Sequence, residues 1–394
     1  MRKMPLQPGL LALALFFSPL QAASTSDWAL PLAGLPGAAV SLPAPVPAPG
    51  VLRGDFTALP AYAFGYLNDL NTRLIDASRR SVDAALFSIT LKDNPDALLR
   101  AKNRGVRVRV IMDEQHVYPR ADAQVKRLMS EPGIEFRTLR GTRSYGVNHN
   151  KILLCDGAAA AIGSYNWTFG ATFSNFENTL VARQPVYTEG YGRYFDWMWS
   201  AARTPQQGPS PELPEGYYGQ PPQDPAPSQS LNGLPVPAYL FSPGSATEER
   251  LARIIDAAAV SVDAVTFTFS SRILADAVVR ARQRGVRVRF LMDTNMAKTS
   301  ALAKQVFDSG AGFRWRIGRT DKGALHNKFV ILDGRLLATG SFNWTVNASK
   351  NSFENLAFVS DAEVVRAYQD NFDSLYESSA VPAAGDFQAE PYGD

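Results

Sequence analysis

Short apolar stretches separated by turn residues predict an alternation of helices and strands along the chain. Ser245 and Glu248 have the spacing of a capping box, and apolar residues follow them at helical intervals. A β-branched run over residues 261–269 predicts a strand, residues 273–284 an amphipathic helix and residues 286–292 a second strand. Because strand–helix–strand connections join parallel strands, this pattern indicates a layered α/β fold.

A second pattern, in which an Asp-Gly pair separates two short apolar runs, predicts a β-hairpin at residues 151–162. If Asp156 and Gly157 alone form the turn, His149 lies directly opposite Ser164 in the ladder. Side chains of alternate strand residues share a face. The sequence therefore predicts that four polar side chains point the same way from this hairpin: His149, Lys151, Ser164 and Asn166.

The hairpin recurs in the second half of the chain with the same internal spacing, and its residues there are His326, Lys328, Asp333, Ser341 and Asn343. Each copy brings together an imidazole, a cation, a hydroxyl and an amide, a set that suits a phosphate next to a reactive nitrogen. The same hairpin geometry places Asp156 and Asp333 in the turns, so we expect both aspartates to be structural. Only three histidines occur in the chain, and two of them lie in this repeat.

The duplication extends beyond the hairpin. Residues 104–113 recur as 284–293, and Phe176-Glu177-Asn178 recurs as residues 353–355. The chain therefore contains a duplicated domain rather than a short-period solenoid. We expect six parts: residues 1–22 a signal peptide, 23–56 an Ala/Pro-rich extended segment, 57–203 the first lobe, 204–235 an exposed Pro-rich linker, 236–378 the second lobe and 379–394 a loose tail.

The N-terminus has the features of a secretory signal peptide. Arg2 and Lys3 precede a short apolar stretch, and the small residues Ala22 and Ala23 follow it at the expected cleavage site. We expect residues 1–22 to be removed and the mature protein to lie in the periplasm or outside the cell. No later segment is apolar and long enough for a transmembrane helix, so the sequence predicts no such anchor in the mature chain.

The net charge and the cysteine content limit the ligands that the chain is expected to bind. The formal net charge of +3 falls to about +1 without the signal peptide, which gives little overall attraction to nucleic acid. Cys155 is the only cysteine, lies in an apolar strand and is expected to be a buried small hydrophobe. We expect neither a metal site nor a cofactor, because the sequence contains no cluster of metal-ligating residues.

The doubled pattern H-x-K-x4-D-x6-G-S-x-N resembles the signature of the phospholipase D superfamily, and the resemblance covers both lobes. The hexapeptides Gly-Ser-Tyr-Asn-Trp-Thr and Gly-Ser-Phe-Asn-Trp-Thr are similar to the corresponding segments of small bacterial endonucleases and mitochondrial-type members of that superfamily. The resemblance implies two tandem α/β lobes, each a mixed sheet flanked by helices, related by pseudo-twofold symmetry. It also implies one shared active site in a monomer that forms an internal pseudo-dimer.

The resemblance further implies catalysis through a phosphohistidine without a metal. It assigns His149 as the nucleophile and His326 as the acid and base, although the residues alone leave the reverse assignment open. The phosphate oxygens would be held by two lysines and two asparagines with two serines in support: Lys151, Lys328, Asn166, Asn343, Ser164 and Ser341. Glu177 and Glu354, each at the same spacing after the histidine of its own copy, would orient an imidazole; the alternative is an ordinary surface glutamate.

The remaining histidine and two tryptophans are expected to lie outside this machinery. The counterpart of His116 in the second copy is Met296, so we expect an exposed loop histidine, with a position near the mouth of the site as the alternative. Trp167 and Trp344 follow the motif in each copy, and we expect them in the core rather than along a substrate groove.

These inferences favour a secreted phosphodiesterase that hydrolyses phospholipid head groups. A nonspecific nuclease acting on DNA or RNA and a phosphatidyltransferase such as a cardiolipin synthase would use the same residues. A non-catalytic binding module is a third alternative, but two complete motifs argue against it, since decay usually removes a histidine or lysine. The expected partner is a phospholipid or another phosphodiester, with nucleic acid as the alternative.

Overall fold

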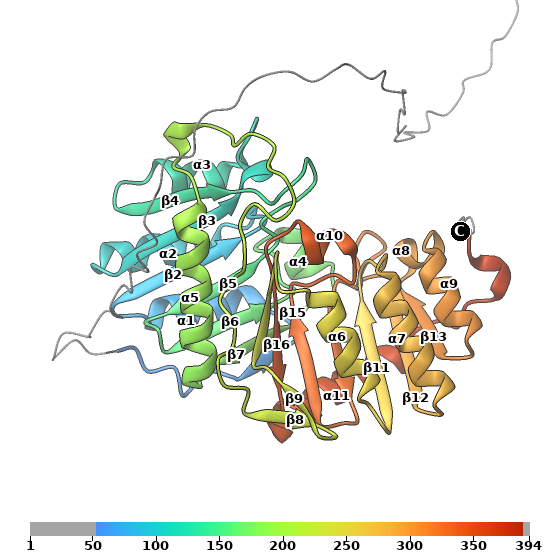
Figure 1. The fold of residues 1–394 in the computed structure, drawn as a ribbon. Helices are drawn as coiled ribbons and strands as arrows, with labels where there is room; N and C mark the ends of the chain where they lie inside the picture. The colour runs from blue at the N-terminus through green and yellow to red at the C-terminus, as the bar shows by residue number, and fades with distance from the viewer. Residues whose placement is uncertain (1–52, 389–394) are drawn as a thin grey trace, which may run out of the picture. The chain divides into compact units, whose positions relative to one another are not determined.

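The computed structural model describes residues 53–388. The expected signal peptide, residues 23–52 of the Ala/Pro-rich segment and residues 389–394 of the tail lie outside this range. Within it, helices and strands build two seven-stranded mixed sheets, one in each half of the chain (Figure 1). The prediction of an α/β fold with two tandem lobes is confirmed.

The first sheet has the strand order β1-β7-β6-β5-β2-β3-β4, in which β2, β3 and β4 run parallel and the other pairings are antiparallel. Its strands are β1 (Tyr62–Ala63), β2 (Ser81–Leu86), β3 (Arg107–Asp113), β4 (Ile134–Leu139), β5 (Lys151–Cys155), β6 (Ala159–Gly163) and β7 (Thr179–Ala182). The helices of this half are α1 (Leu67–Ala77), α2 (Asp93–Asn103), α3 (Ala123–Ser130), α4 (Phe169–Phe173) and α5 (Pro185–Ala201), with the 3-10 turns η1 (Glu114–His116) and η2 (Pro205–Gln207).

The second sheet repeats this order strand for strand as β10-β16-β15-β14-β11-β12-β13. Its strands are β10 (Tyr239–Ser242), β11 (Ser261–Thr266), β12 (Arg287–Asp293), β13 (Gly312–Arg316), β14 (Phe329–Leu332), β15 (Leu336–Gly340) and β16 (Glu354–Val359). The helices of this half are α6 (Thr247–Asp256), α7 (Arg272–Gln283), α8 (Thr294–Lys298), α9 (Ala301–Asp308), α10 (Val346–Lys350) and α11 (Ala362–Glu377), with the turn η3 (Ala384–Asp386).

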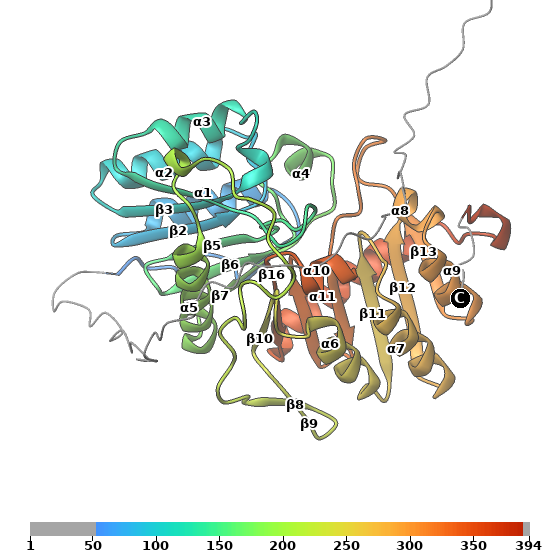
Figure 2. The same ribbon diagram turned by 45° about the horizontal axis from the view of Figure 1, so that its top comes forward.

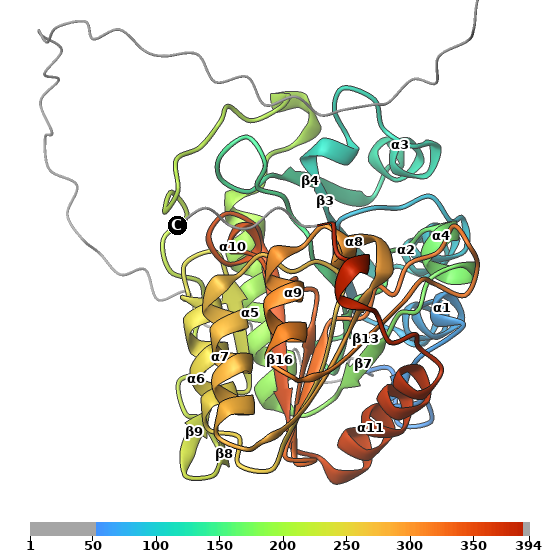
Figure 3. The same ribbon diagram turned by 90° about the vertical axis from the view of Figure 1, so that its right-hand side faces the viewer.

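Three apolar clusters hold these layers together. In the first lobe α1, α2 and α3 pack on one face of the sheet, and α5 lies on the other (Figure 2). In the second lobe α6, α7 and α9 cover one face, and α11 lies across the sheet from them (Figure 3). The third cluster joins the lobes, because α5, α11 and the inner faces of both sheets all contribute to it. The two lobes therefore share one continuous apolar interface.

The register of the predicted hairpins differs by one residue from the expectation. Asp156 and Gly157 form the turn, with φ of 56° and 62°, and the N–H of Ala158 closes it onto the carbonyl of Cys155 at 2.9 Å. The ladder, however, pairs Cys155 with Ala159, so Ala158 is an extra residue, as in a bulge. The second copy behaves alike, with Leu332 paired to Leu336. The expectation that each histidine lies directly opposite a serine was therefore wrong.

Two smaller expectations in the second lobe are also corrected. Ser245 and Glu248 form no capping box, because α6 begins after Ala246, which adopts a left-handed conformation with φ of 50°. Glu248 instead accepts a hydrogen bond from Ser271, the residue that caps α7, and so links the two helices. The strand predicted over residues 261–269 ends earlier, since β11 stops at Thr266.

The connecting segments are more ordered than expected. The linker ends in a hairpin of β8 (Gln229–Leu231) and β9 (Leu234–Val236), and its Tyr218 hydroxyl donates to the carbonyl of Arg140 at 2.7 Å. The tail, expected to be loose, packs on the second lobe through residue 388, where the ring centroid of Phe387 lies 5.2 Å from that of Trp315. Cys155 is buried, as predicted. No helix among residues 53–388 is long and apolar enough to cross a membrane.

Candidate active site

The two motif histidines are brought together by backbone pairing between the lobes. The N–H of His149 donates to the carbonyl of Phe353, and the N–H of His326 donates to the carbonyl of Phe176, each at 3.0 Å. Return bonds run from the N–H of Phe353 to Val147 at 2.8 Å and from that of Phe176 to Ala324 at 2.9 Å. The segment before each histidine is therefore held by the Phe-Glu-Asn segment of the opposite lobe.

Each histidine is oriented by the glutamate of the other lobe. The Nδ1 atom of His149 lies 2.9 Å from a carboxylate oxygen of Glu354, and that of His326 lies 2.9 Å from one of Glu177. Both glutamates are buried, so neither is an ordinary surface residue. A carboxylate can only accept, which puts the hydrogen on Nδ1 and leaves the lone pair of a neutral ring on Nε2. The sequence suggested that each glutamate orients an imidazole, but it did not indicate that each glutamate pairs with the histidine of the other copy.

The motif serines lie behind the glutamates. Ser164 donates from Oγ to Oε2 of Glu177 at 2.6 Å and accepts from the N–H of Asn178 at 3.0 Å. Ser341 bonds in the same way to Glu354, at 2.5 Å. Both hydroxyl hydrogens are thus committed to a carboxylate, which argues against a direct bond from serine to a phosphate oxygen. The serines instead fix the carboxylates that fix the histidines.

The motif lysines are buried beside the histidines. Lys151 Nζ donates to the carbonyl of His149 at 2.5 Å, and Lys328 Nζ donates to that of His326 at 2.6 Å. Each ammonium also lies over an aromatic ring, at 5.0 Å from the centroid of Phe87 for Lys151. Burial lowers the pKa of Lys151 to about 7 and that of Lys328 to about 8. Both ammonium groups retain N–H donors for an anion that enters this space.

The same burial favours the neutral form of both histidines. Burial and the nearby Lys151 and Lys328 charges hold the pKa of His149 well below 6.5. Burial also lowers the pKa of His326, although Glu177 partly opposes it. Burial raises the pKa of Glu354, whereas for Glu177 the charges and hydrogen bonds of His326, Lys328 and Asn175 together outweigh burial and lower the pKa. Because these ionisable groups interact directly, they titrate as a coupled cluster, and the loss of each proton changes the pKa values of the other groups.

The two motif asparagines carry unpaired buried atoms. The Oδ1 atoms of Asn166 and Asn343 accept no hydrogen bond from any residue between 53 and 388. An unsatisfied buried amide in a native structure is costly and commonly marks a place where a ligand or water completes the bonding. This feature agrees with the phosphate-binding assignment that the sequence suggested for both residues.

A second pair of asparagines joins the lobes beneath the histidines. Asn355 donates from Nδ2 to Oδ1 of Asn150 at 2.8 Å, and Asn327 donates to Oδ1 of Asn178 at 3.1 Å. All four residues are buried. No role was predicted for these asparagines, although they recur in both copies of the repeats His-Asn-Lys and Phe-Glu-Asn. These amide pairs fix the lobes in the relative position that the His-Glu pairs need.

The motif aspartates lie in the hairpin turns, away from the histidines. The carboxylate of Asp156 accepts N–H bonds from Gly54, Arg79, Arg80 and Ser81, at 2.7 to 3.2 Å. Asp333 accepts in the same way from residues 259–261 and from the side chain of Asn232. Each aspartate therefore ties a turn to the start of the neighbouring central strand.

The third histidine lies nearer the site than expected. The ring of His116 contacts that of Phe87 edge to face at 4.3 Å, and Phe87 in turn contacts His149 at 4.9 Å. Its side chain is 34% exposed, so His116 is partly accessible, and its contact with Phe87 agrees with the alternative position near the site. Trp167 and Trp344 are buried in the cores of the two lobes, as predicted.

The arrangement can perform nucleophilic substitution at a phosphate. Two carboxylate-oriented imidazoles, two cations and two amides are supplied equally by the two lobes, as phosphoryl transfer through a histidine requires. Among residues 53–388, no group of three or more His, Cys, Asp or Glu side chains is placed to hold a metal ion.

Curated relatives align with less than half of the chain. The chain is 38% identical over 158 residues to the mitochondrial cardiolipin hydrolase of Homo sapiens, an alignment that covers 39% of this chain and 60% of that protein. It is 31% identical over 139 residues to the phospholipase D of Rickettsia felis, covering 34% of this chain and 65% of that one. The chain thus spans about three fifths of the length of the curated relatives it matches.

A solved structure and a family match cover both lobes. The phosphatidylserine synthase of Haemophilus influenzae aligns with a TM-score of 0.65 and 13% identity over 83% of this chain and 89% of that one, a likeness of fold alone. The family described as "Cardiolipin synthase, PLD-like domain" matches residues 72–199 and 251–376. These two regions make up more than half of the chain, which therefore belongs to this family of PLD-like domains within the phospholipase D superfamily.

Proposed function

We propose that the protein is a phosphodiesterase that hydrolyses the head-group phosphodiester bonds of phospholipids. The observation that carries the proposal is the pair of crossed contacts, His149 with Glu354 and His326 with Glu177, both at 2.9 Å. They create two reactive imidazoles in one buried cluster with two lysines. The lipid substrate is supported by the names of the aligned relatives, cardiolipin hydrolase and phospholipase D.

In the first half-reaction, Nε2 of His149 attacks phosphorus while the bond from phosphorus to the leaving head-group oxygen breaks. In the substrate complex the charges of Glu177 and of the phosphodiester favour the protonated form of His326, which gives the proton from Nε2 to that oxygen, so the alcohol leaves neutral. Lys151 and Lys328 balance the charge that builds on the non-bridging oxygens. The product of this step is a phosphohistidine at His149 with the lipid still attached.

In the second half-reaction, His326 is the base. It takes a proton from water, whose oxygen attacks phosphorus as the bond to Nε2 of His149 breaks. Phosphatidic acid leaves and both histidines return to their starting states. The half-sites have equal His-Glu distances, so the choice of His149 as nucleophile rests on the family resemblance.

We also propose that the mature protein acts in the periplasm or outside the cell as a monomer. The signal-peptide features of residues 1–22 support export. The shared apolar interface between the lobes supports a monomer, because one chain supplies both halves of the site.

The test compares the purified protein with His149→Ala and with the control Glu248→Gln, which lies outside the site, on phosphatidylethanolamine vesicles and on plasmid DNA, each with and without EDTA. Head-group release is expected from the wild type and the control but not from His149→Ala. Plasmid nicking without head-group release would overturn the lipid assignment in favour of a nuclease. Loss of all activity on adding EDTA would contradict the metal-free mechanism.

A further inference from the structure

A phenylalanine follows the central strand of each lobe and contacts two motif residues at once. The ring centroid of Phe87 lies 4.9 Å from that of His149 and 5.0 Å from Nζ of Lys151. The ring of Phe267 has the same relation to the histidine and the lysine of the second motif, at 4.9 and 5.3 Å. One aromatic ring in each lobe therefore connects the imidazole to the neighbouring ammonium.

The pairing of the central strands explains where the two rings lie. β2 ends at Leu86, which lies opposite Lys151 at the start of β5, and Phe87 is the next residue. β11 ends at Thr266 and pairs in the same way with β14, which begins directly after Lys328. The duplicated fold thus places an aromatic ring beside the motif lysine in both lobes.

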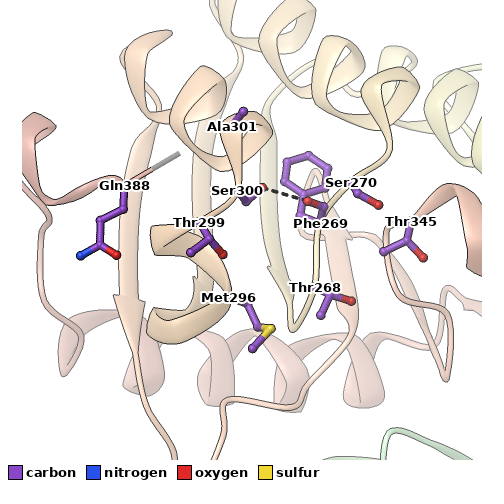
Figure 4. Close-up of a pocket in the computed structure, with 9 residues that line it drawn as sticks. All are labelled: Thr268, Phe269, Ser270, Met296, Thr299, Ser300, Ala301, Thr345 and Gln388. Atoms are coloured by element: carbon purple, nitrogen blue, oxygen red, sulfur yellow. Dashed lines mark hydrogen bonds between the residues drawn. The ribbon is translucent and has the colours of Figure 1, made fainter. Parts of the chain in front are cut away.

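Neither ring is part of a hydrophobic core. Phe87 and Phe267 are partly buried, and neither belongs to the three apolar clusters that hold the layers together. The residues that follow them line open pockets. Figure 4 shows the pocket of the second lobe, which has a volume of about 550 Å³ and begins at Thr268, and the pocket of the first lobe, of about 490 Å³, begins at Ser88. Core packing therefore does not account for these two aromatic residues.

The rings give the buried lysines a neighbour that does not neutralise them. Glu354 and Glu177 pair with the histidines, and among residues 53–388 neither Lys151 nor Lys328 forms an ion pair. Each ammonium has a backbone carbonyl and the face of a phenylalanine instead. The face of an aromatic ring attracts a cation, and the attraction grows where water is excluded. The ring therefore favours the charged form of the lysine and leaves N–H donors free for a phosphate.

The same rings restrain the imidazoles. Both Phe-His contacts are edge to face, with interplanar angles of 68° for His149 and 63° for His326, the geometry that aromatic pairs prefer. The glutamate of the other lobe holds Nδ1, and the phenylalanine contacts the ring itself. Each imidazole is therefore restrained at two places, and one of them also fixes its position relative to the lysine.

We propose that Phe87 and Phe267 are positioning residues: each holds the imidazole of its lobe and supports the positive charge of the ammonium beside it. Neither ring accepts a proton or forms a bond during the reaction, and each acts through the two side chains that it contacts. The inference deepens the proposed function and rests on it for the reaction, but not for the lipid nature of the substrate.

The kinetic test replaces each ring by leucine, which is apolar but has no aromatic face. Phe87→Leu and Phe267→Leu should each lower kcat by about 3- to 30-fold with a smaller change in KM. The alkaline limb of kcat/KM should move to lower pH by about 0.5 to 1.5 pH units, because the charged lysine loses its support. Phe87→Tyr should restore most of the rate and the position of the limb, since tyrosine keeps the ring.

Phe173→Leu is the matched control, because among residues 53–388 the ring of Phe173 contacts only that of Phe169. Leucine variants of Phe87 and Phe267 with the kcat and the pH profile of the wild type would overturn the proposal. A loss of kcat with an unmoved alkaline limb would mean that the rings only fill space, and would overturn it as well.

Sulfate binding tests the support of the charge without any reaction, because sulfate remains a dianion throughout the pH range and contains no bond for the enzyme to cleave. The other charged and titratable groups around the two lysines, all unaltered in the leucine variants, are Glu177, Glu354, Asp113, Asp293, His149 and His326. Calorimetry with sodium sulfate should show an affinity that decreases as the pH rises. The midpoint of this decrease should lie at lower pH in both leucine variants and be unchanged in Phe173→Leu.

The binding result separates this inference from the proposed function. A shifted midpoint in a protein that cleaves no phosphodiester would refute the function and keep the support of the lysines by the rings. Identical sulfate titrations of the wild type and the leucine variants, or no sulfate binding by the wild type, would overturn the inference whatever the substrate is.

Discussion

A carboxylate oxygen of Glu354, a residue of the second lobe, lies 2.9 Å from Nδ1 of His149 in the first lobe. The reciprocal pair joins Glu177 to His326 at the same distance. Each lobe therefore supplies a reactive ring and the carboxylate that orients the other ring. A single lobe contains all the motif residues yet leaves its own histidine without an orienting partner, which explains why the chain needs both copies.

Glu354→Gln tests this orientation. Glutamine keeps an acceptor oxygen but loses the negative charge that stabilises an imidazolium, so we predict that kcat falls by about 10- to 100-fold with little change in KM. Steady-state kinetics on a soluble short-chain phospholipid give the values. Glu248→Gln is the matched control, because Glu248 is also buried but bonds to Ser271 outside the site. Equal losses of kcat in both variants would contradict the orienting role.

Asp156→Ala tests the structural assignment of the motif aspartate. The substitution leaves four backbone N–H groups without their acceptor, so we predict a loss of about 2 kcal/mol or more in the free energy of unfolding. The value of kcat should remain within about twofold at a temperature where the variant is folded, since the carboxylate contacts neither histidine. Urea denaturation and kinetics measure the two quantities. A collapse of kcat at unchanged stability would mean that Asp156 takes part in the chemistry.

The pH profile of kcat/KM should be bell-shaped. The nucleophilic ring must be neutral, and burial holds the pKa of His149 well below 6.5, so the acid limb should lie well below pH 6.5. Raising the pH deprotonates the general acid His326, whose pKa is lowered by burial, and through about 7 and 8 also removes the charges of Lys151 and Lys328 from the free enzyme, so kcat/KM should fall on the alkaline side.

Lys151→Arg provides the control for the alkaline limb. A guanidinium stays charged, so that limb should move to higher pH even though the maximal rate decreases. A rate that rises steadily from pH 6 to pH 9 in the wild type would contradict the assignment of the lysines.

The sequence allowed most of the site to be predicted because its signals are local. The Asp-Gly turns, the alternation of the strands and the repeat of His149 at His326 all lie within short windows. The hairpin register was missed because Ala158 and Arg335, which occupy the extra position of each bulge, carry no side-chain feature that marks it. A one-residue slip is enough to move a side chain to the other face.

The crossed pairs were missed for a different reason. Glu177 and Glu354 have identical spacing to the histidines of their own copies, so the chain order is the same whether a glutamate serves its own lobe or the other. Only the packing of α5 and α11 between the sheets and the amide pair of Asn150 with Asn355 decide between these arrangements. Such contacts join residues about 200 positions apart and leave no local pattern.

Trapping the covalent intermediate tests the central claim most directly. The wild type, His149→Ala and His326→Ala are mixed with a phospholipid carrying ³²P in its phosphodiester and quenched within milliseconds to seconds, and the labelled peptide is identified by mass spectrometry. We predict label on His149 in the wild type, accumulation of that label in His326→Ala because its hydrolysis is slowed, and none in His149→Ala. Label that persists in His149→Ala and vanishes in His326→Ala would reverse the roles, and the absence of label from every protein that turns over would contradict a phosphohistidine.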